Sequence, residues 1–107
     1  MKNREEINAS ICFEAIKEYG NQSQLDVVVE ELAELIQAIQ KLKRNSVNGK
    51  IKLDSKEVKN VISEMADVTI MLFQLQQIVG ISDESIFNEM NRKLDRLKRR
   101  INAKKIV

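Results

Sequence analysis

Two pairs of acidic residues lie inside otherwise apolar helical stretches of this chain: Glu31 with Glu34, and Glu64 with Asp67. The second pair belongs to a segment whose apolar residues recur at three- and four-residue steps, as on one face of a helix. These residues are Val61, Val68, Met71, Leu75 and Ile78. Glu64 fills the one remaining position of that series. Burying even a neutral polar group without a partner costs roughly 2–7 kcal/mol, so a cation or a dense set of hydrogen bonds should compensate a carboxylate there.

Neighbouring side chains on the same helix do not supply that cation. The positions three and four residues away from each of the four acids hold no lysine or arginine, although such neighbours meet on a helix surface. Elsewhere several acids do have a basic residue one turn away, as Glu89 has Arg92. Glu18 lacks one as well, so the missing partner supports a metal site only together with the core position of Glu64.

The spacing also predicts how the four carboxylates meet. At about 100° per residue, each pair spans about 60° of its helix, so antiparallel packing of the two helices would gather all four acids in one small volume. Glu30 adds a fifth acid beside the set, either as a base in the outer shell or as an exposed side chain. Oxygen ligands without His or Cys select a hard cation, Mg²⁺ first and Mn²⁺ second. Because Mg²⁺ normally binds substrate phosphates, the site implies a phosphate-bearing ligand.

Four helices should position these residues. We expect the first from about Asn3 to Tyr19 with Gly20 as its stop, and the second from a capping-box-like start at Ser23 to about Arg44. After a linker with the turn signal Asn48-Gly49, Asp54 or Ser55 should cap a third helix that ends at Gly80, and Ser82 should open the fourth. The sequence therefore predicts an all-α, four-helix, bundle-like fold as a single domain over residues 1–107.

Composition agrees with a charged helical protein: the chain is 43% hydrophobic and 32% charged, and it has no proline and 4% aromatic residues. A core built from 107 residues is modest, so we expect an oligomer. The single Cys12 fits a reducing cytoplasm and a core position on the first helix. The chain begins without the apolar run of a signal peptide, and its longest apolar stretch contains Asp67 and three glutamines, so we expect a cytoplasmic protein without a membrane span.

The last helix carries a second chemical signal. Although the net charge is only +2, basic residues concentrate near the C-terminus. Lys93, Arg96 and Arg100 flank the apolar stripe of that helix on one side and could face bound phosphates, where cations stabilise developing charge. They could equally form a solvated basic face. In the same way, a lone Glu-x-x-Glu is most often solvated, and only two such pairs on consecutive helices favour a metal site.

The segment Glu30-Glu31-Leu32-Ala33-Glu34, followed by Glu64-Met65-Ala66-Asp67, resembles the Glu-Glu-x-x-Glu and Glu-x-x-Asp signature of the MazG-like, all-α nucleoside triphosphate pyrophosphohydrolases. The resemblance extends through the segment from Asn91 to Arg96 and covers roughly residues 20 to 100. The connection between the two acidic pairs is at the long end for that family, which affects the loop around the substrate.

The resemblance implies an enzyme that hydrolyses a (deoxy)nucleoside triphosphate to the monophosphate and pyrophosphate with Mg²⁺, in nucleotide-pool housecleaning. It also implies a homodimer or a dimer of dimers. The implied metal ligands are Glu31, Glu34, Glu64 and Asp67. Glu34 or Glu30 would act on the attacking water. The implied phosphate ligands are Lys93, Arg96 and Asn91, and Arg100, on the same side of the helix, is a fourth candidate.

Two alternatives stay open at this point. Phosphoribosyl-ATP pyrophosphohydrolase uses a similar all-α scaffold, and a direct test of that substrate would identify it. A non-catalytic helical adaptor or nucleic-acid-binding protein would use the basic last helix instead, and would bind duplex DNA with a steep salt dependence. The basic stretch has no interleaved aromatic residues for stacking on single strands, so we expect no nucleic-acid partner.

Overall fold

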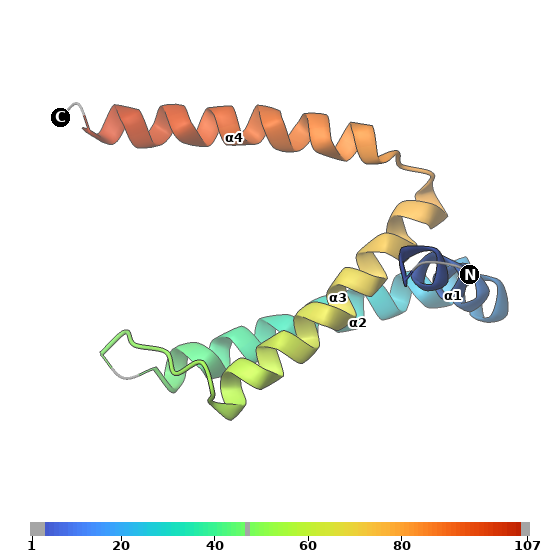
Figure 1. Ribbon diagram of the computed structural model, residues 1–107, viewed down its shortest axis with the longest axis horizontal. Helices are drawn as coiled ribbons and strands as arrows, with labels where there is room; N and C mark the ends of the chain where they lie inside the picture. The colour runs from blue at the N-terminus through green and yellow to red at the C-terminus, as the bar shows by residue number, and fades with distance from the viewer. Residues whose placement is uncertain (1–3, 47, 106–107) are drawn as a thin grey trace.

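The computed structural model describes residues 4–46 and 48–105. It contains four α-helices joined in sequence order: α1 (Arg4–Tyr19), α2 (Asn21–Arg44), α3 (Lys56–Val79) and α4 (Asp83–Lys105) (Figure 1). The prediction of an all-α fold with four helices is confirmed. Three of these helices pack on one another and the fourth stands apart.

A single residue, Gly20, separates α1 from α2. Its φ of 89° lies in the left-handed region that favours glycine, and its N–H donates to the carbonyl of Ile16 at 2.9 Å. The chain turns here and enters α2 at once at Asn21. The prediction that Ser23 caps the second helix is therefore wrong. Because α2 begins at Asn21, Ser23 already lies inside its first turn.

The remaining helix ends follow the capping predictions. Ser55 is the N-cap of α3, and its Oγ accepts a hydrogen bond from the N–H of Val58 at 3.2 Å. Gly80 ends α3 in the left-handed conformation with φ 83°. The Ser82 hydroxyl accepts from the N–H of Ser85 at 3.1 Å just before α4 begins. Together these ends fix the length of α3 and hence the position of Glu64 along it.

The core lies between α2 and α3, which run antiparallel, with α1 packed against both (Figure 1). Its buried apolar residues are Cys12, Val28, Ala38, Val68 and Met71, so the prediction of a core position for Cys12 is confirmed. A buried hydrogen bond from Gln24 Nε2 to Gln74 Oε1, 2.7 Å long, joins the two long helices near α1. With this pair opposite each other, the antiparallel register brings Glu34 level with Glu64 two to three turns further along.

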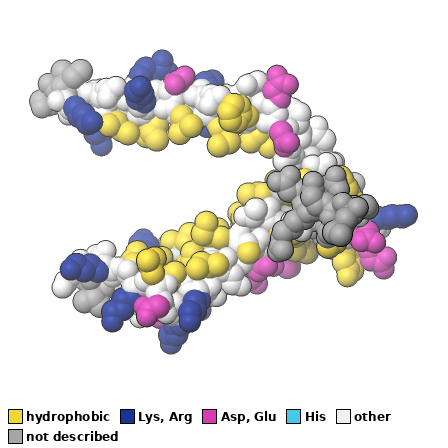
Figure 2. All heavy atoms as spheres, in the orientation of Figure 1, with side chains coloured by type: hydrophobic (Ala, Val, Ile, Leu, Met, Phe, Trp, Pro, Cys, Tyr) yellow, Lys and Arg dark blue, Asp and Glu magenta, His cyan; other side chains and the backbone are white. Residues whose placement is uncertain are grey.

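Within the described residues the fourth helix packs on none of the other three, and a hydrogen bond from Gln76 Nε2 to Asp83 Oδ1 joins it to α3 at the bend. It leaves α3 at a bend of 116° and runs back above the α2–α3 pair, with its hydrophobic side chains turned toward the hydrophobic face of that pair (Figure 2). No residue of α4 is buried. Five of the exposed apolar residues of α4 form the stripe predicted from the sequence: Ile86, Met90, Leu94, Leu97 and Ile101.

Among the described residues, no single helix is both long enough and apolar enough to cross a membrane, and α3 with α4 meet that test only as a pair across their bend.

Candidate metal centre

Three carboxyl groups converge where α2 and α3 pass each other. Glu31 and Glu34 come from α2 and Glu64 from α3, and one oxygen from each lies within 4.8 Å of the others. The geometry follows from the helices, because residues three apart share a face and the antiparallel register sets the two faces opposite each other. The structure thus brings together three of the four acids that the sequence singles out as metal ligands.

Two of these carboxyl groups hold an oxygen that is both buried and unpaired. Glu31 Oε2 and Glu64 Oε2 are shielded from solvent and have no hydrogen-bond partner within the described part of the chain. A buried carboxylate oxygen without a partner costs free energy, so native structures rarely leave one unpaired. No lysine or arginine of the described residues forms an ion pair with either group. The donor set, all carboxylate oxygen, fits a hard divalent cation.

The electrostatics of the cluster are those of anions held close together. Burial first, and then the negative charges of Glu34, Asp67 and Glu64, raise the pKa of Glu31 above 4.5. Burial, and then the charges of Glu34 and Asp67, also raise the pKa of Glu64 above 4.5. No lysine or arginine of residues 4–46 and 48–105 forms an ion pair that offsets this repulsion, whereas a bound metal ion would offset it.

Asp67 and Glu30 lie beside this trio. Asp67 is close enough for its charge to raise the pKa of both Glu31 and Glu64, although it is outside the group whose oxygens converge within 4.8 Å. Glu30 is exposed on α2, about 100° around the helix from Glu31.

The four predicted phosphate ligands lie elsewhere. Lys93, Arg96, Asn91 and Arg100 are exposed residues of α4. Because α4 packs on neither α2 nor α3, a single chain does not bring these four side chains to the acidic cluster. Lys93 instead lies 4.0 Å from Glu89 on its own helix.

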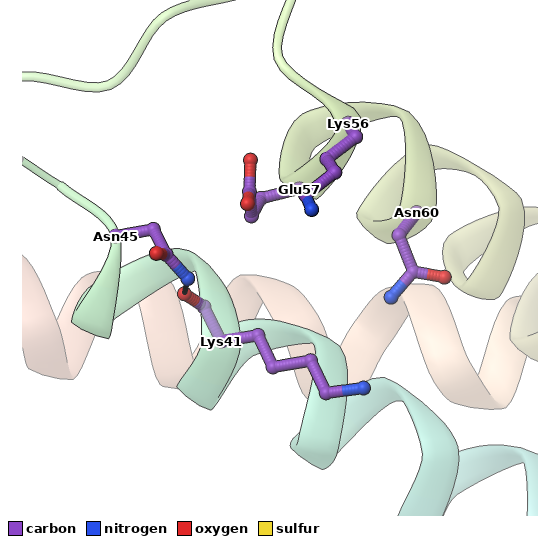
Figure 3. A pocket seen from close by; sticks show the side chains of 5 residues that line it. All are labelled: Lys41, Asn45, Lys56, Glu57 and Asn60. Carbon is purple, nitrogen blue, oxygen red and sulfur yellow. Dashed lines mark hydrogen bonds between the residues drawn. The ribbon is translucent and has the colours of Figure 1, made fainter.

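The sequence reasoning overlooked a cavity beside the cluster. It has a volume of about 490 Å³ and is lined by Lys41 and Asn45 at the end of α2 and by Lys56, Glu57 and Asn60 at the start of α3 (Figure 3). The signal was present in the spacing, since Lys41 follows Glu34 by seven residues and Asn60 precedes Glu64 by four. Both intervals return a side chain to nearly the same helix face.

A family model described as the MazG nucleotide pyrophosphohydrolase domain matches residues 19–101, which is most of the chain and includes both acidic pairs. No curated protein and no solved structure matches the chain.

Proposed function

Since this chain belongs to the MazG nucleotide pyrophosphohydrolase domain family, we propose that it hydrolyses a (deoxy)nucleoside triphosphate to the monophosphate and pyrophosphate with Mg²⁺. The observation that carries the proposal is the trio of Glu31, Glu34 and Glu64, with two buried oxygens that lack partners. Carboxyl groups held in this unfavourable arrangement are what a bound divalent cation would stabilise.

The residues present fit a divalent ion. Glu31 and Glu64 would hold it through their buried oxygens, with Glu34 at the edge of the cluster and Asp67 beside it. Mg²⁺ is the expected ion and Mn²⁺ a possible substitute, because every candidate ligand is a carboxylate. When bound, such an ion neutralises phosphate charge and lowers the pKa of a coordinated water.

The chain's own residues would then direct the hydrolysis. Water attacks the α-phosphorus, the bond between that phosphorus and the bridging oxygen breaks, and pyrophosphate leaves with the electron pair. Glu34, or Glu30 four residues earlier, accepts the proton of the attacking water and keeps the water aligned. Glu34 has the better placement, since it approaches both Glu31 and Glu64.

The active form would be a homodimer or a dimer of dimers. The chain exposes 9028 Å², whereas a compact monomer of 12.3 kDa exposes about 6,100 Å². The excess is well above the roughly 800 Å² per partner of a standard interface. A second copy would cover the apolar faces of α4 and of the α2–α3 pair. The predicted role of Lys93 and Arg96 in holding phosphates requires such a second chain or a different position of α4.

The test is pyrophosphate release from a panel of ribonucleoside and deoxyribonucleoside triphosphates, with phosphoribosyl-ATP included, in Mg²⁺ and in EDTA. We expect metal-dependent release from at least one member, lost in Glu64→Gln and kept in Glu18→Gln, which removes a carboxylate of α1 outside the cluster. No turnover across the whole panel by a folded protein would overturn the proposed reaction.

A further inference from the structure

The cavity between the end of α2 and the start of α3 has the chemistry of an anion site. Two lysines and two asparagine amides line it with a single carboxylate, Glu57. Figure 3 shows Lys41 and Asn45 on one side and Lys56, Glu57 and Asn60 on the other. Asn45 Nδ2 donates to the carbonyl oxygen of Lys41 at 2.8 Å, which fixes that side chain at the rim.

Both lysines are available for a ligand. Neither Lys41 nor Lys56 has a carboxylate oxygen within 4.0 Å among the described residues, where the only ion pairs are on α4. The surrounding chain strengthens the positive potential, since residues 41–59 contain seven lysines and arginines against two acids. A cleft with a concentration of one sign of charge attracts ligands of the opposite sign.

The cavity also shares a helix face with the acidic cluster. Lys41 follows Glu34 by seven residues, which places it about 10 Å along α2 and rotated by only about 20°. Asn60 precedes Glu64 by four residues, one turn along α3. A ligand that begins at the carboxylates and extends along this face therefore reaches Asn60 first and the two lysines next. The flexible stem of a lysine shortens the remaining distance.

From this arrangement we propose that the cavity binds the terminal phosphates of the substrate, so that Lys41, Lys56 and Asn60 hold the part of the triphosphate that leaves as pyrophosphate. The assignment rests on the proposed function and adds a specificity to it. A triphosphate spans both the acidic cluster and the lysines, whereas a monophosphate product contacts the cluster alone. The cavity thus selects for the longer phosphate chain.

Glu57 gives the proposal a prediction of opposite sign. Its carboxylate faces the same cavity and repels an anionic ligand, so pyrophosphate is held less tightly than the lysines alone would hold it. Removing that charge in Glu57→Gln should strengthen binding, while removing the lysine charges should weaken it.

The experiment measures equilibrium binding of inorganic pyrophosphate by calorimetry in Mg²⁺, together with the KM and kcat of the best substrate from the panel. For Lys41→Ala/Lys56→Ala we expect about tenfold weaker pyrophosphate binding and a similar rise in KM, as for two exposed charge-assisted contacts. Glu57→Gln should tighten binding severalfold. Lys41→Arg/Lys56→Arg should retain most of the affinity.

A matched control removes the same charge from the same helices outside the cavity. Lys43→Ala/Lys59→Ala changes two exposed lysines that do not line it, and it should leave binding nearly unchanged. Equal losses in both double variants would reduce the effect to general electrostatics and overturn the proposal. Unchanged binding in the cavity variant, or no pyrophosphate binding by the wild type, would also overturn it. Lysine-dependent binding without turnover would instead support the cavity and overturn only the proposed reaction.

Discussion

Placing a charge in the apolar stripe of α4 should break the assembly that the proposed function requires. Leu94 is at the middle of the stripe and is 56% exposed. Covering that exposed part in an interface contributes about 1 kcal/mol, because burying a whole leucine side chain contributes about 1.5–3 kcal/mol. Burying an aspartate in its place costs at least about 2 kcal/mol more. In a two-fold dimer both contacts change, so Leu94→Asp should cost about 6 kcal/mol, or about 10⁴-fold in the dimer dissociation constant.

Sedimentation equilibrium over a wide concentration range measures that constant directly. The matched control is Asn88→Asp, which adds the same charge to α4 on the side away from the stripe and should leave the dimer intact. Circular dichroism checks that α4 remains helical in both variants, and the pyrophosphate-release assay shows whether activity is lost together with the dimer.

A monomeric wild type at all concentrations would refute the reasoning. It would mean that the excess surface is covered by α4 folding back onto its own α2–α3 pair, and a radius of gyration near the roughly 13 Å of a compact chain of this length, instead of 17.9 Å, would identify that form. A dimer that tolerates Leu94→Asp would place the interface elsewhere.

Three further predictions concern the metal centre and the helix ends. Glu64→Gln should reduce Mg²⁺-dependent turnover at least about 100-fold while the metal-free protein keeps its helical circular dichroism and melts no earlier, since a repelling charge is gone; wild-type activity in this variant would exclude the site. In EDTA, the raised pKa values of Glu31 and Glu64 mean that the folded state binds protons more readily than the unfolded state. The free energy of unfolding, measured in urea, should therefore rise as the pH falls through those raised values toward 4.5. A Glu31→Gln/Glu64→Gln variant should lose that part of the pH dependence, and equal slopes in both proteins would contradict the assignment. Ser55→Ala should lower the free energy of unfolding by about 1 kcal/mol, because the N–H of Val58 loses its acceptor; no change in urea unfolding would show that the cap contributes nothing.

The sequence allowed prediction of those features that depend on local chemistry. Serine caps and left-handed glycines located the ends of α3 and the start of α4, and an apolar stripe with Glu64 in it located the partly buried acid. The start of α2 was missed because a capping-box pattern at Ser23 resembles a start even when the turn at Gly20 has already begun the helix. Helical periodicity shows which face of a helix is apolar, but not which partner covers that face. For this reason the position of α4, and with it the distance from Lys93 and Arg96 to the acids, could not be predicted.

The α2–α3 pair has an acidic face and an apolar face, and the two have different roles. In an antiparallel pair, residues displaced from the contact by the same rotation fall on the same side. Glu34 of α2 and Asp67 of α3 are displaced one way, while the exposed apolar residues Ile36 and Met65 are displaced the other way. Figure 2 shows the apolar side turned toward α4, with acidic side chains along the opposite edge. A second copy can therefore cover the apolar face and leave the carboxylates open to a nucleotide. Lys41 and Lys56 line a cavity on the acidic side of the pair, so a helix seated on the apolar face leaves them accessible to phosphates beside the acids.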